Sequence, residues 1–219
     1  MNLFFVSLAI IFCGGLLPLI FWRQFTLMKT VGIVGIGVGC LLGLIDAGTK
    51  LFNPGPYTAS LDYLNAFSLS FQIDTLSAFF LVAIYLICLL AALYSYHYMA
   101  DPQKAFRTAG NYLFFSLLTI SMALVVTAGN LIAFMLSWEI MSLSSFFLVV
   151  YNYEAEENRK AGYLYFVFTQ VGAMFILAAF GLIYAHSGNF GFIDAAALTD
   201  TTKIIVFVLA FIGFGSKAG

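Results

Sequence analysis

Two ionisable side chains stand inside long apolar runs of this sequence. Glu139 lies near the middle of residues 130–151, and Lys217 lies in the last run, residues 204–219. A helix of about 20 apolar residues spans a bilayer, so both side chains are predicted to lie at membrane depth. Charged groups at that depth are costly, and they pair with one another or line a path for protons or ions. The remaining charges are predicted to lie almost entirely between the apolar runs.

An acid and an amine that meet in an apolar interior can form a proton relay. Counting along each run gives Glu139 and Lys217 depths that differ by roughly 6 Å, at about 1.5 Å per residue. Burial disfavours the charged form of each group, whereas their mutual attraction favours it. We therefore expect the pair to be either charged together or discharged by the transfer of one proton.

Three further residues are predicted to support this pair. Ser142 lies one helical turn from Glu139, where its hydroxyl can bond the carboxyl group or hold water. Lys217 stands in GFGSKAG, in which Gly213 and Gly215 are predicted to loosen the helix. Irregular backbone at this depth is tolerated where it lines a protein-buried or watered cavity. The alternative that stays open is a structural salt bridge beside serines that only pack helices.

The elements that must position these residues are helices that cross a membrane. The apolar runs predict an all-α, polytopic bundle of about seven spans at residues 3–22, 30–45, 75–96, 108–127, 130–151, 161–185 and 204–219. Residues 46–73, with Pro54 and Pro56, are predicted to be the longest loop. We expect residues 1–73 to hold the first two spans and an outer loop. Residues 74–219 are expected to hold helices three to seven, with the start of a proton-channel repeat.

Composition excludes several classes of protein. The chain is 63% hydrophobic and 9% charged, which is unlike a water-soluble domain, and its net charge of −1 gives no basic surface for nucleic acid. Three cysteines fall singly in different runs, with no spacing that would ligate zinc or an iron–sulfur cluster. We expect no metal and no cofactor on this chain, so any redox chemistry belongs to other chains.

The distribution of basic residues predicts the orientation in the membrane. Of the nine Lys and Arg residues, Lys217 lies inside a span and two fall on one side, Lys50 and Lys203. The other six fall on the opposite side: Arg23, Lys29, Lys104, Arg107, Arg159 and Lys160. By the positive-inside rule the side with six is cytoplasmic, which places the N-terminus outside.

Local patterns predict how some helices begin and pack. Asp74 precedes a charge-free run and is predicted to cap its helix, with a functional role as the second choice. Gly129 and Asn130 predict a tight turn before the fifth span. Gly35, Gly39 and Gly43 lie on one helical face, which favours close contact with a neighbouring helix.

Three stretches of this sequence resemble one family of membrane subunits. They are DTLSAF at residues 74–79, GNLIAFMLSWEIMSLSSFFLV at residues 129–149 and GFGSKAG at residues 213–219. Together they resemble the antiporter-like, proton-conducting subunits of complex I, Mrp-type antiporters and group 4 membrane-bound hydrogenases. The MSLSSFFLV continuation and the KAG after the lysine are most similar to the large antiporter-like subunit of formate hydrogenlyase-type complexes. The resemblance covers essentially the whole chain and is strongest from Gln72 onward.

The resemblance implies a function and a set of partners. It implies that Glu139 and Lys217 form the coupled pair at the entry of a proton channel, within a complex of other membrane and peripheral redox subunits. It also implies a bacterial or archaeal inner membrane and a longer subunit, of which this chain is expected to be the N-terminal fragment. Where complex I subunits often carry ionisable residues on helix six, this chain has Gln170 and Ala173. A helix-six acid is therefore not expected here.

Four other functions share features with a hydrogenase-type proton-translocating subunit. A complex I subunit or an Mrp-type cation/proton antiporter subunit would share its motifs. A microbial rhodopsin would share its seven spans and the lysine on the seventh, but it needs a carboxylate in the third span, and residues 75–96 contain none. A membrane scaffold without transport is the alternative from a different class.

Overall fold

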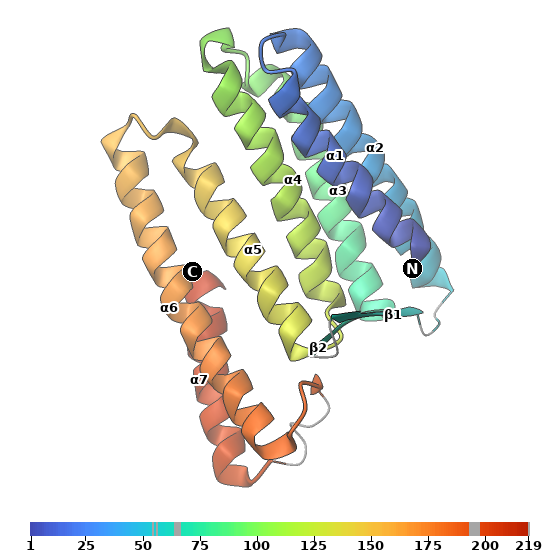
Figure 1. Ribbon diagram of the computed structural model, residues 1–219, viewed down its shortest axis with the longest axis vertical. Helices are drawn as coiled ribbons and strands as arrows, with labels where there is room; N and C mark the ends of the chain where they lie inside the picture. Colours follow the sequence, from blue (N-terminus) through green and yellow to red (C-terminus); the bar gives the residue numbers. More distant parts are fainter. Residues whose placement is uncertain (54, 56, 64–66, 193–197, 219) are drawn as a thin grey trace. The chain divides into compact units, whose positions relative to one another are not determined.

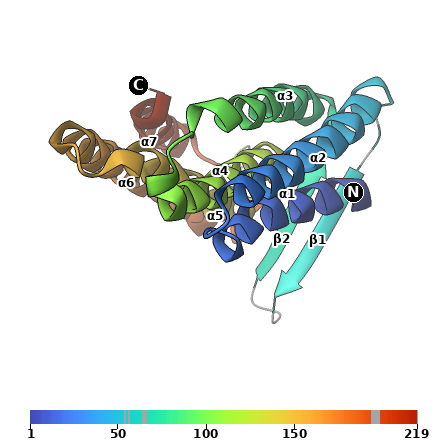
Figure 2. The ribbon, with the colours of Figure 1, turned by 90° about the horizontal axis from the view of Figure 1, so that it is seen from above.

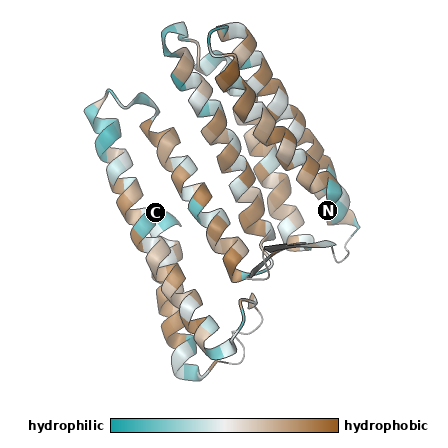
Figure 3. Cartoon of the chain, viewed as in Figure 1, coloured by the Kyte–Doolittle hydropathy of each residue, from teal (hydrophilic) through white to brown (hydrophobic). Residues whose placement is uncertain are grey.

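Long helices make up most of the part of the chain that the structure describes (Figure 1). The computed structural model describes residues 1–53, 55, 57–63, 67–192 and 198–218. Within those ranges all seven helices are long and apolar enough to cross a membrane: α1 (Asn2–Ile20), α2 (Phe25–Phe52), α3 (Thr75–Tyr98), α4 (Ala105–Thr127), α5 (Leu131–Val149), α6 (Glu156–Ser187) and α7 (Asp200–Ala218). Figure 3 shows apolar residues along each of them and hydrophilic residues mainly near their ends. The predicted all-α, multi-pass bundle is confirmed.

The helices fall into two compact units. Unit 1 contains Met1–Ala59 and Phe71–Thr127, and so holds α1 to α4. Unit 2 contains Ser60–Ser70 and Ala128–Gly219, and so holds α5 to α7. Glu139 and Lys217 both belong to unit 2. The sequence analysis divided the chain differently, into residues 1–73 and residues 74–219, where a channel repeat is expected to start. That division stays a prediction.

Glycines let the helices of unit 1 approach closely. A Cβ atom at Gly35 would lie 2.5 Å from the Cα atom of Gly14 on α1, and one at Gly39 would lie 2.4 Å from a side-chain carbon of Ile11. Neither position has room for a methyl group, which is why α1 and α2 pack side by side (Figure 2). The packing role predicted for the glycine stripe of α2 is confirmed.

Helix α2 is longer than the sequence suggested, and it carries buried charges. It extends to Phe52, so Asp46 and Lys50 lie inside the helix and not in a loop. Both are buried, with 6% and 5% of their surface exposed, and Lys50 Nζ lies 2.5 Å from Asp46 Oδ2. Their spacing of four residues lets the charges neutralise each other, so the helix continues through an apolar interior. The prediction that nearly all other charges lie between the spans was wrong here.

Part of the long predicted loop is a β-hairpin. Strands β1 (Tyr57–Tyr63) and β2 (Phe67–Ile73) form a two-stranded sheet, and residues 54, 56 and 64–66 lie outside the described ranges. The β2 sequence FSLSFQI alternates apolar and polar residues, and Phe71 and Ile73 are buried. That alternation is typical of a half-buried strand, so the prediction of a loop throughout residues 46–73 was wrong here.

The helix ends follow ordinary capping chemistry. The Asp74 carboxylate accepts a hydrogen bond from the Ser77 amide at 2.7 Å, and the Asn130 side chain accepts one from the Ala133 amide at 2.8 Å. Both predicted caps are confirmed. Helix α6 ends at Ser187, and Gly188 follows with a φ of 72°, in the left-handed region that closes many helices. Two short 3₁₀ turns, Pro102–Lys104 and Val150–Asn152, precede α4 and follow α5.

Candidate functional site

Helix α5 presents the acid and the hydroxyl of the candidate site on one face. Asn130 caps its first turn, so Trp138, Glu139 and Ser142 lie within the regular part of the helix. Glu139 is half-buried, and Ser142 is buried, with 2% of its surface exposed. The Ser142 hydroxyl donates to the carbonyl oxygen of Trp138 at 2.9 Å. Its lone pairs therefore remain available to accept a further bond.

Helix α7 brings Lys217 to this face of α5. The Lys217 ammonium donates to Ser142 Oγ at 2.8 Å, and Nζ lies 4.8 Å from the centre of the Trp138 ring. A cation over an indole face is attracted by the ring quadrupole. Among the described residues no ion pair within 4.0 Å joins Lys217 to Glu139. The lysine therefore rests one turn from the acid, on uncharged partners.

Helix α6 supplies the partner of Glu139. Gln170 Nε2 donates to Glu139 Oε2 at 3.3 Å, and the Gln170 side chain is half-buried. The sequence had marked Gln170 only as a departure from subunits with ionisable residues on this helix. The structure shows that its amide contacts the candidate acid. Three helices thus contribute to the site: α5 the acid and hydroxyl, α6 the amide and α7 the amine.

Aromatic rings close one side of the lysine. Trp138 stacks on Phe134, with ring centres 5.6 Å apart, and it meets Phe214 edge to face at 5.4 Å. Phe134 also meets Phe214 edge to face at 5.9 Å. Trp138, which Lys217 contacts, is thus part of an apolar cluster of three rings. Sequence reasoning did not identify Trp138, although its position beside Glu139 and the abundance of aromatic residues were available signals.

Neither Gly213 nor Gly215 loosens the helix beside Lys217, and Gly213 packs it against α6. Helix α7 is regular through Ala218, so the predicted irregular backbone was wrong. A Cβ atom at Gly213 would lie 2.5 Å from a side-chain carbon of Ile176 and 2.8 Å from the Gly172 carbonyl oxygen. Gly213 is needed for the close approach of α6 and α7, which fixes the height of Lys217 beside α5. Gly215 faces open space, with no atom within 4 Å of a built Cβ.

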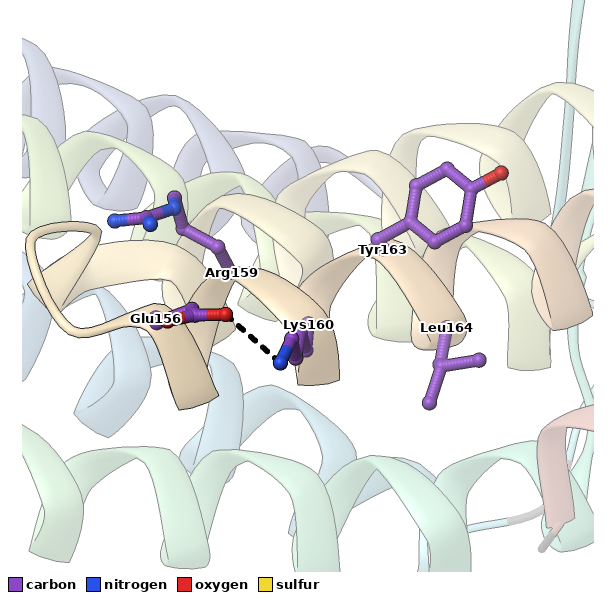
Figure 4. Close-up of a pocket in the computed structure, with 5 residues that line it drawn as sticks. All are labelled: Glu156, Arg159, Lys160, Tyr163 and Leu164. Carbon is purple, nitrogen blue, oxygen red and sulfur yellow. Dashed lines mark ion pairs between the residues drawn. The ribbon is translucent and has the colours of Figure 1, made fainter.

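Charged residues at the start of α6 form a solvated surface. Figure 4 shows a shallow pocket lined by five residues of that one helix: Glu156, Arg159, Lys160, Tyr163 and Leu164. Lys160 Nζ lies 2.8 Å from Glu156 Oε1, and the two side chains are 72% and 68% exposed. An exposed pair of this kind contributes little. In the part of the chain that the structure describes, no group of three or more His, Cys, Asp or Glu residues is placed to hold a metal ion.

Comparison with known proteins identifies the family from two separate regions. The family model described as "NADH:quinone oxidoreductase/Mrp antiporter, TM" matches residues 128–219, which include the whole candidate site. A second model, "NADH-Ubiquinone oxidoreductase (complex I), chain 5 N-terminus", matches residues 62–107. Both models describe membrane subunits of the kind that the three sequence motifs resemble.

Individual relatives extend the match over nearly the whole chain. Hydrogenase-4 component B of Escherichia coli is 33% identical over 219 residues, covering 98% of this chain and 31% of that protein. A chain of the archaeal membrane-bound sulfane sulfur reductase has a TM-score of 0.77 and 26% identity, over 96% of this chain and 34% of the other. A chain of the Mrp complex from a Dietzia species has a TM-score of 0.80 at 20% identity, over 99% of this chain and 24% of the other, which shows the shared fold.

The matched proteins are much longer than these 219 residues. The chain spans less than a third of the length of the hydrogenase component. The two family models match α3 and the α5–α7 site, and the three sequence motifs lie within the matched residues. This chain belongs to the superfamily of antiporter-like membrane subunits found in NADH:quinone oxidoreductase, Mrp antiporter and hydrogenase complexes.

Proposed function

We propose that this chain is part of a proton-translocating subunit in a respiratory or hydrogenase oxidoreductase complex, with Glu139 and Lys217 as its relay pair. The observation that carries this proposal is the bond from Lys217 to Ser142, one helical turn from Glu139. It brings the amine of α7 to the acid-bearing face of α5. An amine at this place can move between the hydroxyl and the carboxylate by a change of side-chain rotamer.

The relay works by changing the charge of the pair. A charged Lys217 is attracted by an ionised Glu139, and in apolar surroundings this attraction is much stronger than in water. When Lys217 passes a proton to an acceptor, the amine becomes neutral and the attraction ends. A charge that arrives elsewhere in the complex can then set which state is favoured. This is how electrostatic energy is converted into the movement of a proton.

The surroundings of the subunit follow from the same proposal. The relatives named above are components of multisubunit membrane complexes, so we infer that this chain binds other membrane subunits and peripheral redox subunits. Electron carriers are assigned to those partners. The membrane is the cytoplasmic membrane of a bacterium or archaeon, with the basic ends of the spans, including Arg159 and Lys160, on the cytoplasmic side.

The test is Glu139→Gln in the assembled complex. In inverted membrane vesicles, redox turnover should continue while the number of protons taken up per turnover falls, because the acid that responds to Lys217 is removed. Glu157→Gln is the matched control, since Glu157 is an exposed acid in the first turn of α6. That control should leave both quantities unchanged.

Two alternatives make different predictions in the same experiment. A membrane scaffold without transport predicts normal assembly and unchanged proton uptake after Glu139→Gln, and that result would overturn the proposal. An Mrp-type antiporter, which one matching family model names, predicts that the pH gradient depends on added Na⁺. Proton uptake that is independent of Na⁺ supports the oxidoreductase subunit.

A further inference from the structure

The two charged groups of the site are held by different neutral groups. Gln170 on α6 bonds the Glu139 carboxylate, whereas Ser142 and Trp138 on α5 hold the Lys217 ammonium. In a simple buried salt bridge the two charges would bind each other directly. The observed arrangement keeps them apart, although the Lys217 ammonium of α7 binds α5 only one turn from the Glu139 carboxylate. Something must therefore reduce the tendency of Glu139 to capture Lys217.

The position of Gln170 is determined by tight packing between α6 and α7. Gly172 lies two residues after Gln170 on α6, and a Cβ atom there would lie 1.7 Å from Ser216 Oγ. Ser216 directly precedes Lys217 on α7. The neighbouring Thr169 is buried and returns its hydroxyl to the Tyr165 carbonyl at 2.9 Å, so it does not compete for Glu139. Gln170 is thus the α6 side chain that the packing aims at the acid, at the level where Lys217 leaves α7.

An amide suits this position because it donates a hydrogen bond without adding charge. A carboxylate has about four acceptor sites, and one N–H from Gln170 uses one of them. A cation at the same place would hold Glu139 permanently ionised and fully paired. An acid would repel it. An amide orients the carboxylate and leaves acceptor sites open for Lys217.

We propose that Gln170 is a positioning residue that orients Glu139 and competes with Lys217 for it, so that Lys217 rests on Ser142 and Trp138 between transfers. This inference rests on the proposed relay function. Gln170 acts through Glu139 and does not itself carry a proton. Its amide sets how readily the lysine leaves its resting place for the acid.

The experiment uses the assembled complex and the redox-induced infrared difference spectrum. The C=O stretching band of the Glu139 carboxyl group is first identified as the band that disappears in Glu139→Gln. Gln170→Met removes the N–H donor at nearly constant volume, and the band should shift to the frequency of a carboxyl group with one fewer hydrogen bond. Proton uptake per redox turnover should fall several-fold, with redox turnover retained. Gln103→Met, in the exposed turn before α4, is the control and should change neither quantity.

A second substitution covers the case in which Gln170→Met prevents assembly. Gln170→Glu has nearly the same shape as the native side chain, so the complex should assemble. Its carboxylate should repel that of Glu139 and so shift the frequency of the Glu139 C=O band. An unchanged Glu139 band in either assembled variant overturns the positioning role. Failure of the relay can be told apart from failure of the positioning role. If the relay is wrong, Glu139→Gln leaves proton uptake unchanged. The Glu139 band of the wild type and of the Gln170 variants still reports whether Gln170 contacts Glu139.

Discussion

The Nζ atom of Lys217 lies 4.8 Å from the centre of the Trp138 indole ring, on the helix that also carries Glu139. Trp138 precedes Glu139 in the sequence, and Ser142 follows it by three residues, so the lysine reaches α5 on both sides of the acid. This contact makes Trp138 part of the site and not only of the apolar surface. It also explains how an amine can rest beside an acid without forming an ion pair.

Replacing Trp138 should weaken the resting place of Lys217. Trp138→Leu removes a cation–π attraction of about 1–2 kcal/mol, whereas Trp138→Phe keeps part of it. We expect proton uptake per redox turnover in inverted vesicles to fall several-fold with Leu and less with Phe. Trp22→Leu is the matched control, because it removes a similar contact with Arg23, at 5.5 Å, in unit 1. Equal losses in the Trp138 and Trp22 variants would argue for a general packing effect.

Removing the hydroxyl of Ser142 should shift Lys217 toward Glu139. In Ser142→Ala the ammonium loses its acceptor at 2.8 Å, and the Glu139 carboxylate, one turn away on α5, is a charged acceptor that can replace it. Proton uptake should slow several-fold because the pair becomes harder to separate, and Ser142→Thr should restore it. Ser145→Ala is the control, since that hydroxyl donates within its own helix, to the Met141 carbonyl oxygen. If Ser142→Ala matches the wild type, the hydroxyl is not a resting site.

Adding side-chain volume at Gly213 should separate α6 from α7. Gly213→Val places a branched side chain where even a Cβ atom would lie 2.5 Å from Ile176. Overpacking of this kind costs about 1–3 kcal/mol, which should appear as a lower unfolding midpoint in a denaturing detergent. Gly215→Ala serves as the control, because no atom lies within 4 Å of its built Cβ. Loss of stability in Gly215→Ala alone would contradict the packing described here.

Breaking the buried ion pair of α2 should destabilise unit 1. Lys50→Met leaves the Asp46 carboxylate buried without its partner, at a cost of about 3–5 kcal/mol. The double replacement Asp46→Leu with Lys50→Met removes both charges and should recover most of that loss. A double-mutant cycle on the unfolding free energy measures the coupling between the two side chains. Additive effects would show that the pair contributes nothing beyond its separate members.

The cap at the start of α3 should give a small pH dependence. The backbone N–H of Ser77 holds the pKa of the Asp74 carboxyl below its usual value. Because the pKa is lower in the folded chain, the stabilisation is complete above about pH 4, the ordinary value, and is lost as the pH falls through the folded-state pKa. Asp74→Asn should keep the cap and lose this pH dependence, which helicity measured by circular dichroism during acid titration can check. The same acid dependence in Asp74→Asn would assign it to another group.

The sequence predicted the spans and the level of the site well, for a clear physical reason. Apolar runs of bilayer length have few alternatives to a spanning helix. Counting residues along two of them was enough to predict that Glu139 and Lys217 lie at similar depths. The caps at Asp74 and Asn130 were also predictable, because each depends on one side chain and a backbone amide three residues away.

Other features depend on contacts that a linear pattern does not contain. The choice of Lys217 between Ser142 and Glu139 is decided by side-chain rotamers over a few ångströms, and the role of Gln170 depends on how α6 packs against α7. The end of α2 was misjudged because Asp46 and Lys50 lower the local hydropathy, whereas their mutual neutralisation keeps them inside the helix. Gly213 was misread because a glycine that loosens a helix and one that packs it look identical in sequence.

The Ser142 hydroxyl imposes a direction on the amine that it holds. Its single hydrogen is committed to the Trp138 carbonyl oxygen, so toward Lys217 it can only accept. A deprotonated Lys217 that stays at this place keeps an N–H pointing at Ser142, so its lone pair points away from that hydroxyl. Ser142 therefore holds the amine but cannot return its proton, and the next proton must come from a different group.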